Sequence, residues 1–226
     1  PQVRPRTIRK PLSELMDDNL LRFADDKKFV FIDCETLNLC LHGFRNEPWQ
    51  IAMIERVGNK IVKKHDLYLD WDSGLRISDG AARVTRFSQY AFDQKKKPAC
   101  DEMKIVLEAL QGADYIAGHN LLGFDVYLLR IAFQRCGLPW KFMMPKIVDT
   151  LAFMKGVRME SKVSKDEDLL AYQFKQINTV KRLKCSLGAL GKEFEIEHDY
   201  AGLHNALNDL ELNIKVWDKI KYRIQT

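Results

Sequence analysis

The sequence has no long hydrophobic run. Among its 226 residues, no apolar stretch approaches the roughly 20 residues that a membrane-spanning helix needs. The first residues, PQVRPRTIRKP, also lack the apolar segment of a signal peptide, so we expect a protein that is not secreted. The chain begins at Pro1 without a methionine, from which we expect either a processed chain or a domain cut from a longer protein.

Cysteine is scarce and its spacing is irregular. The chain has 5 cysteines, an odd number, and no C-x-x-C pair, which argues against both a disulfide framework and a zinc site. The sequence therefore predicts free thiols in the cytoplasm or another reducing intracellular compartment. These cysteines are Cys34, Cys40, Cys100, Cys136 and Cys185.

Charge of one sign is not strongly in excess. Lys and Arg number 36 and Asp and Glu 31, so the formal charge of +5 permits a nucleic-acid partner without requiring one. Hydrophobic residues make up 46% of the chain, enough for the core of one large domain or two small ones.

The chain divides into an N-terminal segment and a larger patterned region. Residues 1–11 read as a basic tail, either solvated or a nucleic-acid arm, and residues 12–23 as a surface helix. From residue 29 onward, strands come first and then alternate with helices, which predicts one α/β domain over 29–226 with a mixed sheet. The expected strands are 29–35, 49–57, 60–71, 115–117 and 146–148. The expected helices are 81–92 (part helix, part loop), 101–110, 124–136, 151–155, 169–176, 186–194 and 203–221, with a basic loop at 95–97.

Two carboxylates close the first of these strands. The strand residues from Phe29 to Ile32 are all apolar, as in a strand covered on both faces, and Asp33 and Glu35 follow. Side chains two apart on a strand point the same way, so these acids lie side by side. Either they face water at the strand end, or a divalent cation relieves their repulsion.

Further acids and a histidine come at two later points. Asp125 follows a short strand and a turn at the start of a helix, which suits either a ligand site or an acid favoured by the helix dipole. Asp209 lies in an unusually apolar helical region, where a carboxylate needs a partner. His204, five residues earlier, would not share its face on a continuous helix, so we expect it in the preceding loop or first turn, in a functional or merely structural role.

Together these residues resemble the DEDDh family of 3′–5′ exonucleases, which includes the proofreading subunit of bacterial replicative polymerase, oligoribonuclease and RNase T. The three motifs of that family read here Asp33-Cys-Glu35, Asn120 to Asp125, and His204-Asn-Ala-Leu-Asn-Asp209. The similarity runs from about residue 29 to about residue 220. Two departures occur: Asn38 stands where the family often has glycine, and the second motif has one residue more than many members.

The resemblance implies an RNase H-like fold with a five-stranded mixed sheet flanked by helices. It implies two Mg²⁺ ions, replaceable by Mn²⁺, which would stabilise the attacking and leaving oxygens of a phosphodiester displacement. In the family pattern Asp33, Glu35, Asp125 and Asp209 hold the metal and His204 is the general base.

The resemblance also implies a substrate site and a product. The 3′-terminal nucleotide would contact Thr36, Leu39, Asn120 and Phe124, although Phe124 also suits a core position. The expected activity is removal of nucleoside 5′-monophosphates from the 3′ end of single-stranded DNA or from mismatched ends. A polymerase or replication complex and a homodimer are allowed as partners.

Two alternatives stay open at this point. The same chemistry on short RNA would make the protein an exoribonuclease, distinguishable by its dependence on the terminal 2′-hydroxyl. A catalytically idle nucleic-acid-binding module would keep the fold without turnover, although the complete set of four acids and His204 argues against it.

Overall fold

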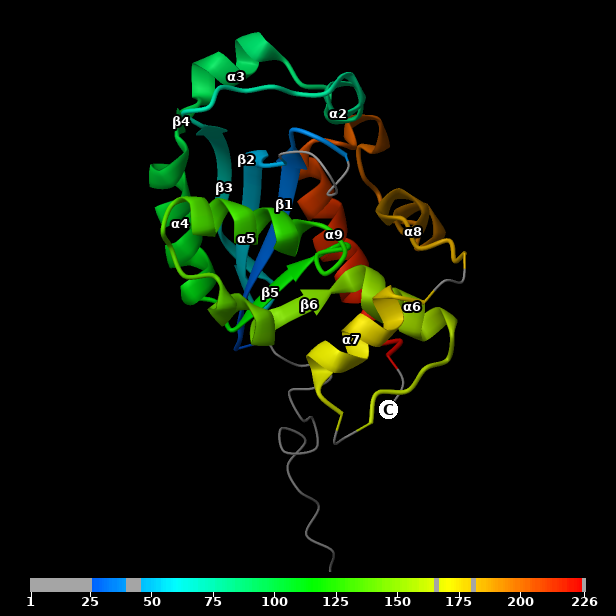
Figure 1. Ribbon diagram of the computed structural model, residues 1–226. Coiled ribbons are helices and arrows are strands. Elements are labelled where there is room, and N and C mark those ends of the chain that lie inside the picture. Colours follow the sequence, from blue (N-terminus) through cyan, green and yellow to red (C-terminus); the bar gives the residue numbers. More distant parts are fainter. Residues whose placement is uncertain (1–25, 40–45, 165–166, 180–181, 225–226) are drawn as a thin grey trace, which may run out of the picture.

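A mixed six-stranded sheet forms the centre of the molecule, with the strand order β4-β3-β2-β1-β5-β6 (Figure 1). The computed structural model describes residues 26–39, 46–164, 167–179 and 182–224, so the predicted tail, the helix at 12–23 and Cys40 lie outside the described residues. β1 pairs antiparallel with β2 and parallel with β5, and β5 pairs parallel with β6. This arrangement confirms the predicted α/β class with a mixed sheet, and β2 also pairs antiparallel with β3. The strands are β1 (Lys28–Thr36), β2 (Pro48–Val57), β3 (Lys60–Asp70), β4 (Lys97–Pro98), β5 (Tyr115–Gly118) and β6 (Ile147–Asp149).

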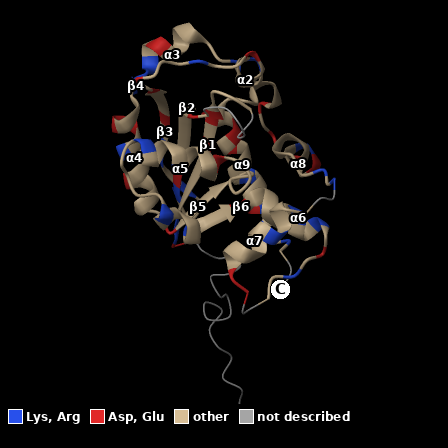
Figure 2. Ribbon diagram, viewed as in Figure 1, with Lys and Arg blue, Asp and Glu red and all other residues tan. Residues whose placement is uncertain are grey.

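The sheet has one strand more than the five we predicted. The added strand, β4, is two residues long and pairs parallel with the end of β3, at Leu69 and Asp70. We had assigned this basic stretch to a loop. Its lysines instead form ion pairs with nearby acids: Lys95 with Asp66 at 3.3 Å, and Lys96 with Asp70 at 3.3 Å. Figure 2 shows basic and acidic segments side by side at the end of α3. These pairings hold the segment against β3.

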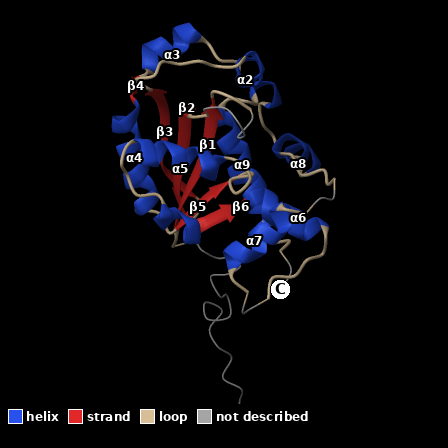
Figure 3. Ribbon diagram, in the orientation of Figure 1, coloured by secondary structure: helices blue, strands red, loops and turns tan. Residues whose placement is uncertain are grey.

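Helices cover both faces of the sheet (Figure 3). α4 and α5 pack on one face, and α9 crosses the other face over β1 and β2, beside α6. The helices are α2 (Asp79–Thr85), α3 (Gln89–Lys95), α4 (Ala99–Gln111), α5 (Asp125–Arg135), α6 (Thr150–Arg158), α7 (Leu169–Ile177), α8 (Leu187–Glu193) and α9 (Ala206–Ile220), with 3₁₀ turns η2 (Lys141–Lys146) and η3 (Tyr200–Gly202).

The segment we expected to hold one short helix at 81–92 contains two. Arg86 adopts a left-handed conformation, with φ of 52°, and ends α2. The side chain of Ser88 then accepts a hydrogen bond from the Ala91 N–H and begins α3. α2 and α3 lie beyond the carboxyl end of β1, above the sheet in Figure 1.

The alternation of side chains along β1 decides which of them pack against which helices. Val30 and Ile32 belong to the core under α4 and α5, whereas Phe29 and Phe31 belong to the core under α6 and α9. Successive side chains on a strand point to opposite faces. The odd-numbered residues of β1 therefore face α9.

One prediction about the cysteines is wrong. Cys100, in the first turn of α4, and Cys136, the residue that caps α5, form a disulfide with a Cα–Cα distance of 5.3 Å. Their sequence separation of 36 gave no sign of this pairing, because only the packing of α4 beside α5 brings the two together. Cys34 and Cys185 are free, as predicted, and both are buried. Cys100 and Cys136 therefore give no support to the prediction of a reducing compartment.

No helix in the described ranges has the length and apolar character to cross a membrane.

Candidate active site

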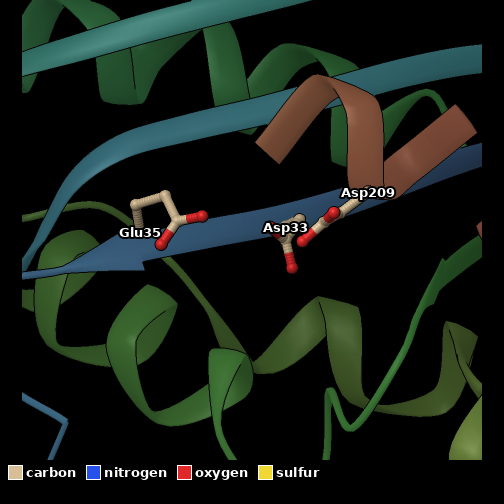
Figure 4. Close-up of side chains that lie close together, drawn as sticks. All are labelled: Asp33, Glu35 and Asp209. Carbon is tan, nitrogen blue, oxygen red and sulfur yellow. The ribbon is translucent and has the colours of Figure 1, made fainter. Parts of the chain in front are cut away.

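Three carboxylates meet where β1 passes under the first turn of α9. One oxygen each from Asp33, Glu35 and Asp209 lies within 4.8 Å of the others (Figure 4). Asp33 and Glu35 share the α9-facing side of β1, because they continue the odd-numbered positions of the strand. Asp209 comes from the first turn of α9, more than 170 residues later in the chain. Figure 2 shows the acidic segments at this end of β1 and at the start of α9.

The three acids repel one another and are poorly solvated. Burial is the main cause that raises the pKa of Asp33, and the charges of Asp125, Glu35 and Asp209 raise it further. Burial together with the charges of Asp209 and Asp125 raises the pKa of Glu35 to about 8. The pKa of Asp209 is raised by burial as well. A divalent cation would oppose these shifts, since opposite charge favours the ionised form.

This donor set fits Mg²⁺. The ion prefers carboxylate oxygens, usually binds through one or two of them, and keeps several waters. Asp33 and Asp209 remain partly exposed, so water has access to the cluster. The residues that would hold the ion are therefore Asp33, Glu35 and Asp209.

Asp125 approaches the cluster from the opposite face of the sheet. It is the first residue of α5, and its Oδ1 accepts a hydrogen bond of 3.0 Å from the backbone N–H of Cys34. Burial raises its pKa to about 7, and this hydrogen bond partly opposes the shift. Asp125 lies outside the group of three mutually close oxygens but is near enough to raise the pKa of Asp33. Its position suits a supporting role at the metal.

His204 lies in the loop before α9, as we expected. Its backbone has a φ of 70°, and its N–H donates to both Asp209 oxygens, at 3.2 and 3.3 Å. The charge of His204 also lowers the pKa of Asp209. The loop therefore ties the histidine to a residue of the acid cluster and leaves its side chain exposed.

The residues predicted to contact the nucleotide differ in how exposed their side chains are. Leu39 is 49% exposed and lies beside α2, where a Cβ on Gly80 would be 3.7 Å from its Cδ1. Thr36 is buried, with its hydroxyl bonded to Asn46, so only its backbone remains for a ligand. Phe124 is half-buried against the core under α4 and α5, which agrees with the core alternative that we left open.

The turn that carries Asn120 is held by a buried carboxylate. Asp149 accepts hydrogen bonds from the backbone N–H groups of Asn120, at 3.0 Å, and Leu122, at 2.9 Å. It also caps α6 through the N–H groups of Leu151 and Ala152. The acid that ends a strand gives no sign in sequence that it also fixes the neighbouring turn, because that turn is 29 residues away.

His119 is a structural residue beside this turn. Its Nε2 lies 2.9 Å from the Cys185 carbonyl oxygen and its Nδ1 lies 3.0 Å from the Thr150 hydroxyl. Burial lowers its pKa to about 4, so the ring is neutral at physiological pH. A neutral imidazole with its proton on Nε2 would donate a hydrogen bond to the Cys185 carbonyl oxygen. His119 therefore links β5, α6 and the segment before α8.

Solved structures with the same fold are structures of exonuclease I. The complex of the Escherichia coli enzyme with a dT13 oligonucleotide superposes with a TM-score of 0.65 and 20% identity, over 87% of this chain and 41% of that one. The complex of the Escherichia coli enzyme with dA16 superposes with a TM-score of 0.67 and 19% identity, over 87% of this chain and 41% of that one. A complex titled ExoI/SSB-Ct superposes with a TM-score of 0.65 and 20% identity, over 88% of this chain and 42% of that one. The chain thus spans about two fifths of the length of these structures, and at this identity they show the fold. They confirm the RNase H-like architecture predicted from the motifs.

Curated protein sequences include no match to this chain. A family model described as Exonuclease, named RNase_T, does match, over residues 30–217. That range includes the acids of β1, Asp125, His204 and Asp209, and it covers most of the chain. The chain therefore belongs to the RNase T family of exonucleases, which are nuclease hydrolases.

Proposed function

We propose that this protein is a divalent-metal-dependent 3′–5′ exonuclease that releases nucleoside 5′-monophosphates from single-stranded DNA or frayed 3′ ends. The observation that carries the proposal is the convergence of Asp33, Glu35 and Asp209 within 4.8 Å, at the strand end where the family has its motifs. Membership in the exonuclease family supports the reaction class. The oligonucleotides in the similar Escherichia coli structures support single-stranded DNA as the substrate.

Each residue of the site has a part in this proposal. Asp33, Glu35 and Asp209 would hold the catalytic ion, and Asp33 and Asp125 would help to hold a second ion. Bound Mg²⁺ would stabilise the charge on the attacking and leaving oxygens. His204 accepts the proton of the attacking water, because a neutral imidazole nitrogen can act as a general base. Leu39 and the Asn120 turn, with Phe124 and the Thr36 backbone, position the terminal nucleotide.

The test compares 5′-labelled DNA and RNA oligonucleotides of one sequence, with Mg²⁺, with Mn²⁺ and with EDTA. We expect a ladder of shortened DNA products with either metal and none with EDTA. Asp209→Asn should lower the rate by about 10³-fold or more, because a metal ion supplies several kcal/mol of transition-state stabilisation. The matched control is Asp101→Asn, an exposed acid on α4 that forms an ion pair with Lys104.

Three results would contradict the proposal in different ways. A ladder on RNA alone would make the protein an exoribonuclease. Degradation that persists in EDTA, or in Asp209→Asn at the wild-type rate, would remove the metal site from the mechanism. Tight oligonucleotide binding without any turnover in either metal would indicate a binding module.

A further inference from the structure

A pocket beside the acid cluster joins α2 to the loop before α9. Its volume is about 400 Å³, and both His204 and Arg86 line it. His204 reaches the acid cluster through the hydrogen bonds of its N–H to Asp209. A strand whose 3′-terminal phosphodiester lies at the acids therefore has this pocket next to it. The remaining lining residues are Thr85, Asp199, Gly202, Asn205 and Asn208.

Most polar groups of the lining are already engaged. The Thr85 hydroxyl donates to the Ala81 carbonyl oxygen at 2.9 Å, and Asn205 Oδ1 accepts from the Asn208 N–H at 3.3 Å. Asp199 is the acidic residue of the lining, and its Oδ1 accepts the N–H groups at both Ala201 and Gly202, at 3.1 Å each. Through these hydrogen bonds, the backbone N–H groups of η3 stabilise the negative charge of the Asp199 carboxylate.

Arg86 is different, because its charge has no partner among the residues that the structure describes. Its side chain is exposed, and within those ranges its guanidinium forms no ion pair or hydrogen bond, with Asp199 or with any other residue. A guanidinium presents five donors in a planar fork that matches a phosphate. Arg86 thus brings a free cation to a pocket that otherwise offers satisfied polar groups and the His204 ring.

The backbone of Arg86 also argues for a function. Its φ of 52° lies in the left-handed region, and its N–H donates to the Ala82 carbonyl oxygen to end α2. Glycine is the usual residue at such a helix end, because a side chain there costs about 1 kcal/mol. An arginine that accepts this cost without packing or pairing is expected where a side chain serves a ligand.

We propose that Arg86 binds the backbone phosphate next to the scissile one, on its 5′ side. This inference rests on the proposed exonuclease function and adds a contact to it. In a strand cut at its 3′ end, the scissile phosphate has a neighbour only on the 5′ side. Arg86 would hold that neighbour while the acids and His204 act on the terminal linkage, so it is a substrate-positioning residue.

The variant that tests this is Arg86→Gly. Glycine keeps the left-handed backbone without strain, so the fold and its thermal stability should be retained or improved. We expect the KM for single-stranded DNA to rise about 10- to 100-fold, as for the loss of a charged hydrogen-bonded pair, with a smaller change in kcat. The slope of log Kd against log salt should fall by about 0.7, the value for one phosphate contact on a single strand.

The matched control is Arg83→Gln. Arg83 is an exposed basic residue of the same helix, and it does not line the pocket. Its loss removes the same charge from α2, so it measures the general electrostatic attraction of this segment. An equal KM increase in both variants would overturn the proposal, because it would show a diffuse charge effect.

The decisive experiment removes the phosphate charge as well. Fluorescent oligonucleotides carry one neutral methylphosphonate, at the second linkage from the 3′ end or at the sixth, and binding is measured with Ca²⁺. Wild type should lose affinity about 10-fold or more with the second-linkage probe only, and Arg86→Gly should show no further loss with it. Additive losses, or coupling only at the sixth linkage, would overturn the assignment.

Measurements of turnover and of binding test the two proposals separately. Failure of wild type to shorten DNA in Mg²⁺ would overturn the exonuclease function, whereas the binding coupling would still report on Arg86. Normal turnover with no coupling between Arg86 and the second linkage would overturn only the Arg86 contact.

Discussion

Replacing Glu35 by glutamine should stabilise the metal-free protein and weaken its response to Mg²⁺. Burial and the neighbouring acids raise the pKa of Glu35 from 4.5 to about 8. At 1.36 kcal/mol per pKa unit, this shift corresponds to at most about 5 kcal/mol between the two protonation states. Relaxation of the site and entry of water reduce the measured effect to a few kcal/mol.

The direction of this pH effect on stability follows from whether the folded or the unfolded state binds more protons. Between pH 4.5 and about 8 the folded carboxyl keeps its proton while the unfolded one loses it. The folded protein then binds more protons, so the stability contributed by Glu35 is complete below pH 4.5 and is lost as the pH rises to about 8. Glutamine resembles the protonated acid and does not titrate, so it keeps that stability at every pH.

The assay is chemical denaturation at pH 5, 6, 7 and 8, in EDTA and in Mg²⁺. In EDTA, Glu35→Gln should match wild type near pH 5 and exceed it by a few kcal/mol at pH 8. In Mg²⁺ the difference should shrink or reverse, because the cation stabilises the ionised site of the wild type. Glu108→Gln, on the exposed side of α4, is the control and should follow wild type throughout. Lower stability of Glu35→Gln than wild type at pH 8 in EDTA would refute the reasoning.

Three other changes test the site and the fold. His204→Ala should lower kcat about 10²- to 10⁴-fold, the usual range for a general base, with stability in EDTA little changed; a wild-type rate in single-turnover assays would exclude the role. Gly118→Ala should destabilise the protein by about 1–3 kcal/mol in a denaturant titration, because its Cβ would lie 2.7 Å from the Ile32 carbonyl oxygen; full stability would show that β1 and β5 can separate. Replacing Cys100 and Cys136 together by serine should cost about 2–4 kcal/mol of unfolding free energy and leave the metal response intact, and an altered Mg²⁺ midpoint would instead connect the disulfide to the site.

Local patterns predicted the parts of the fold that depend on neighbouring residues. The apolar run of β1 with its two acids, the strands β2 and β3, and the helix at Asp125 all follow from local sequence patterns. Element ends moved by a few residues, as for α6, which we expected to stop at Lys155 and which continues to Arg158. Packing against α7 and α9 extends it, and packing is not visible in a local pattern.

The misses share one physical cause, since each depends on residues distant in sequence. β4 forms because Lys97 and Pro98 meet the end of β3, and the disulfide forms because α4 and α5 pack on one face. The two hydrogen bonds of Asp149 to the Asn120 turn require β5 and β6 to be neighbours. No spacing rule within a single strand or helix contains that information.

The site itself divides in the same way. The resemblance of three sequence motifs to the DEDDh family was enough to identify Asp33, Glu35, Asp125, His204 and Asp209 as candidates, and these residue types suit a metal nuclease. Only the tertiary structure decided that Asp209 closes the group with Asp33 and Glu35, that Asp125 arrives from the other face, and that Arg86 lines the pocket of His204. Strand alternation sets the face of a side chain, but the distance between two side chains on different elements is set by how those elements pack.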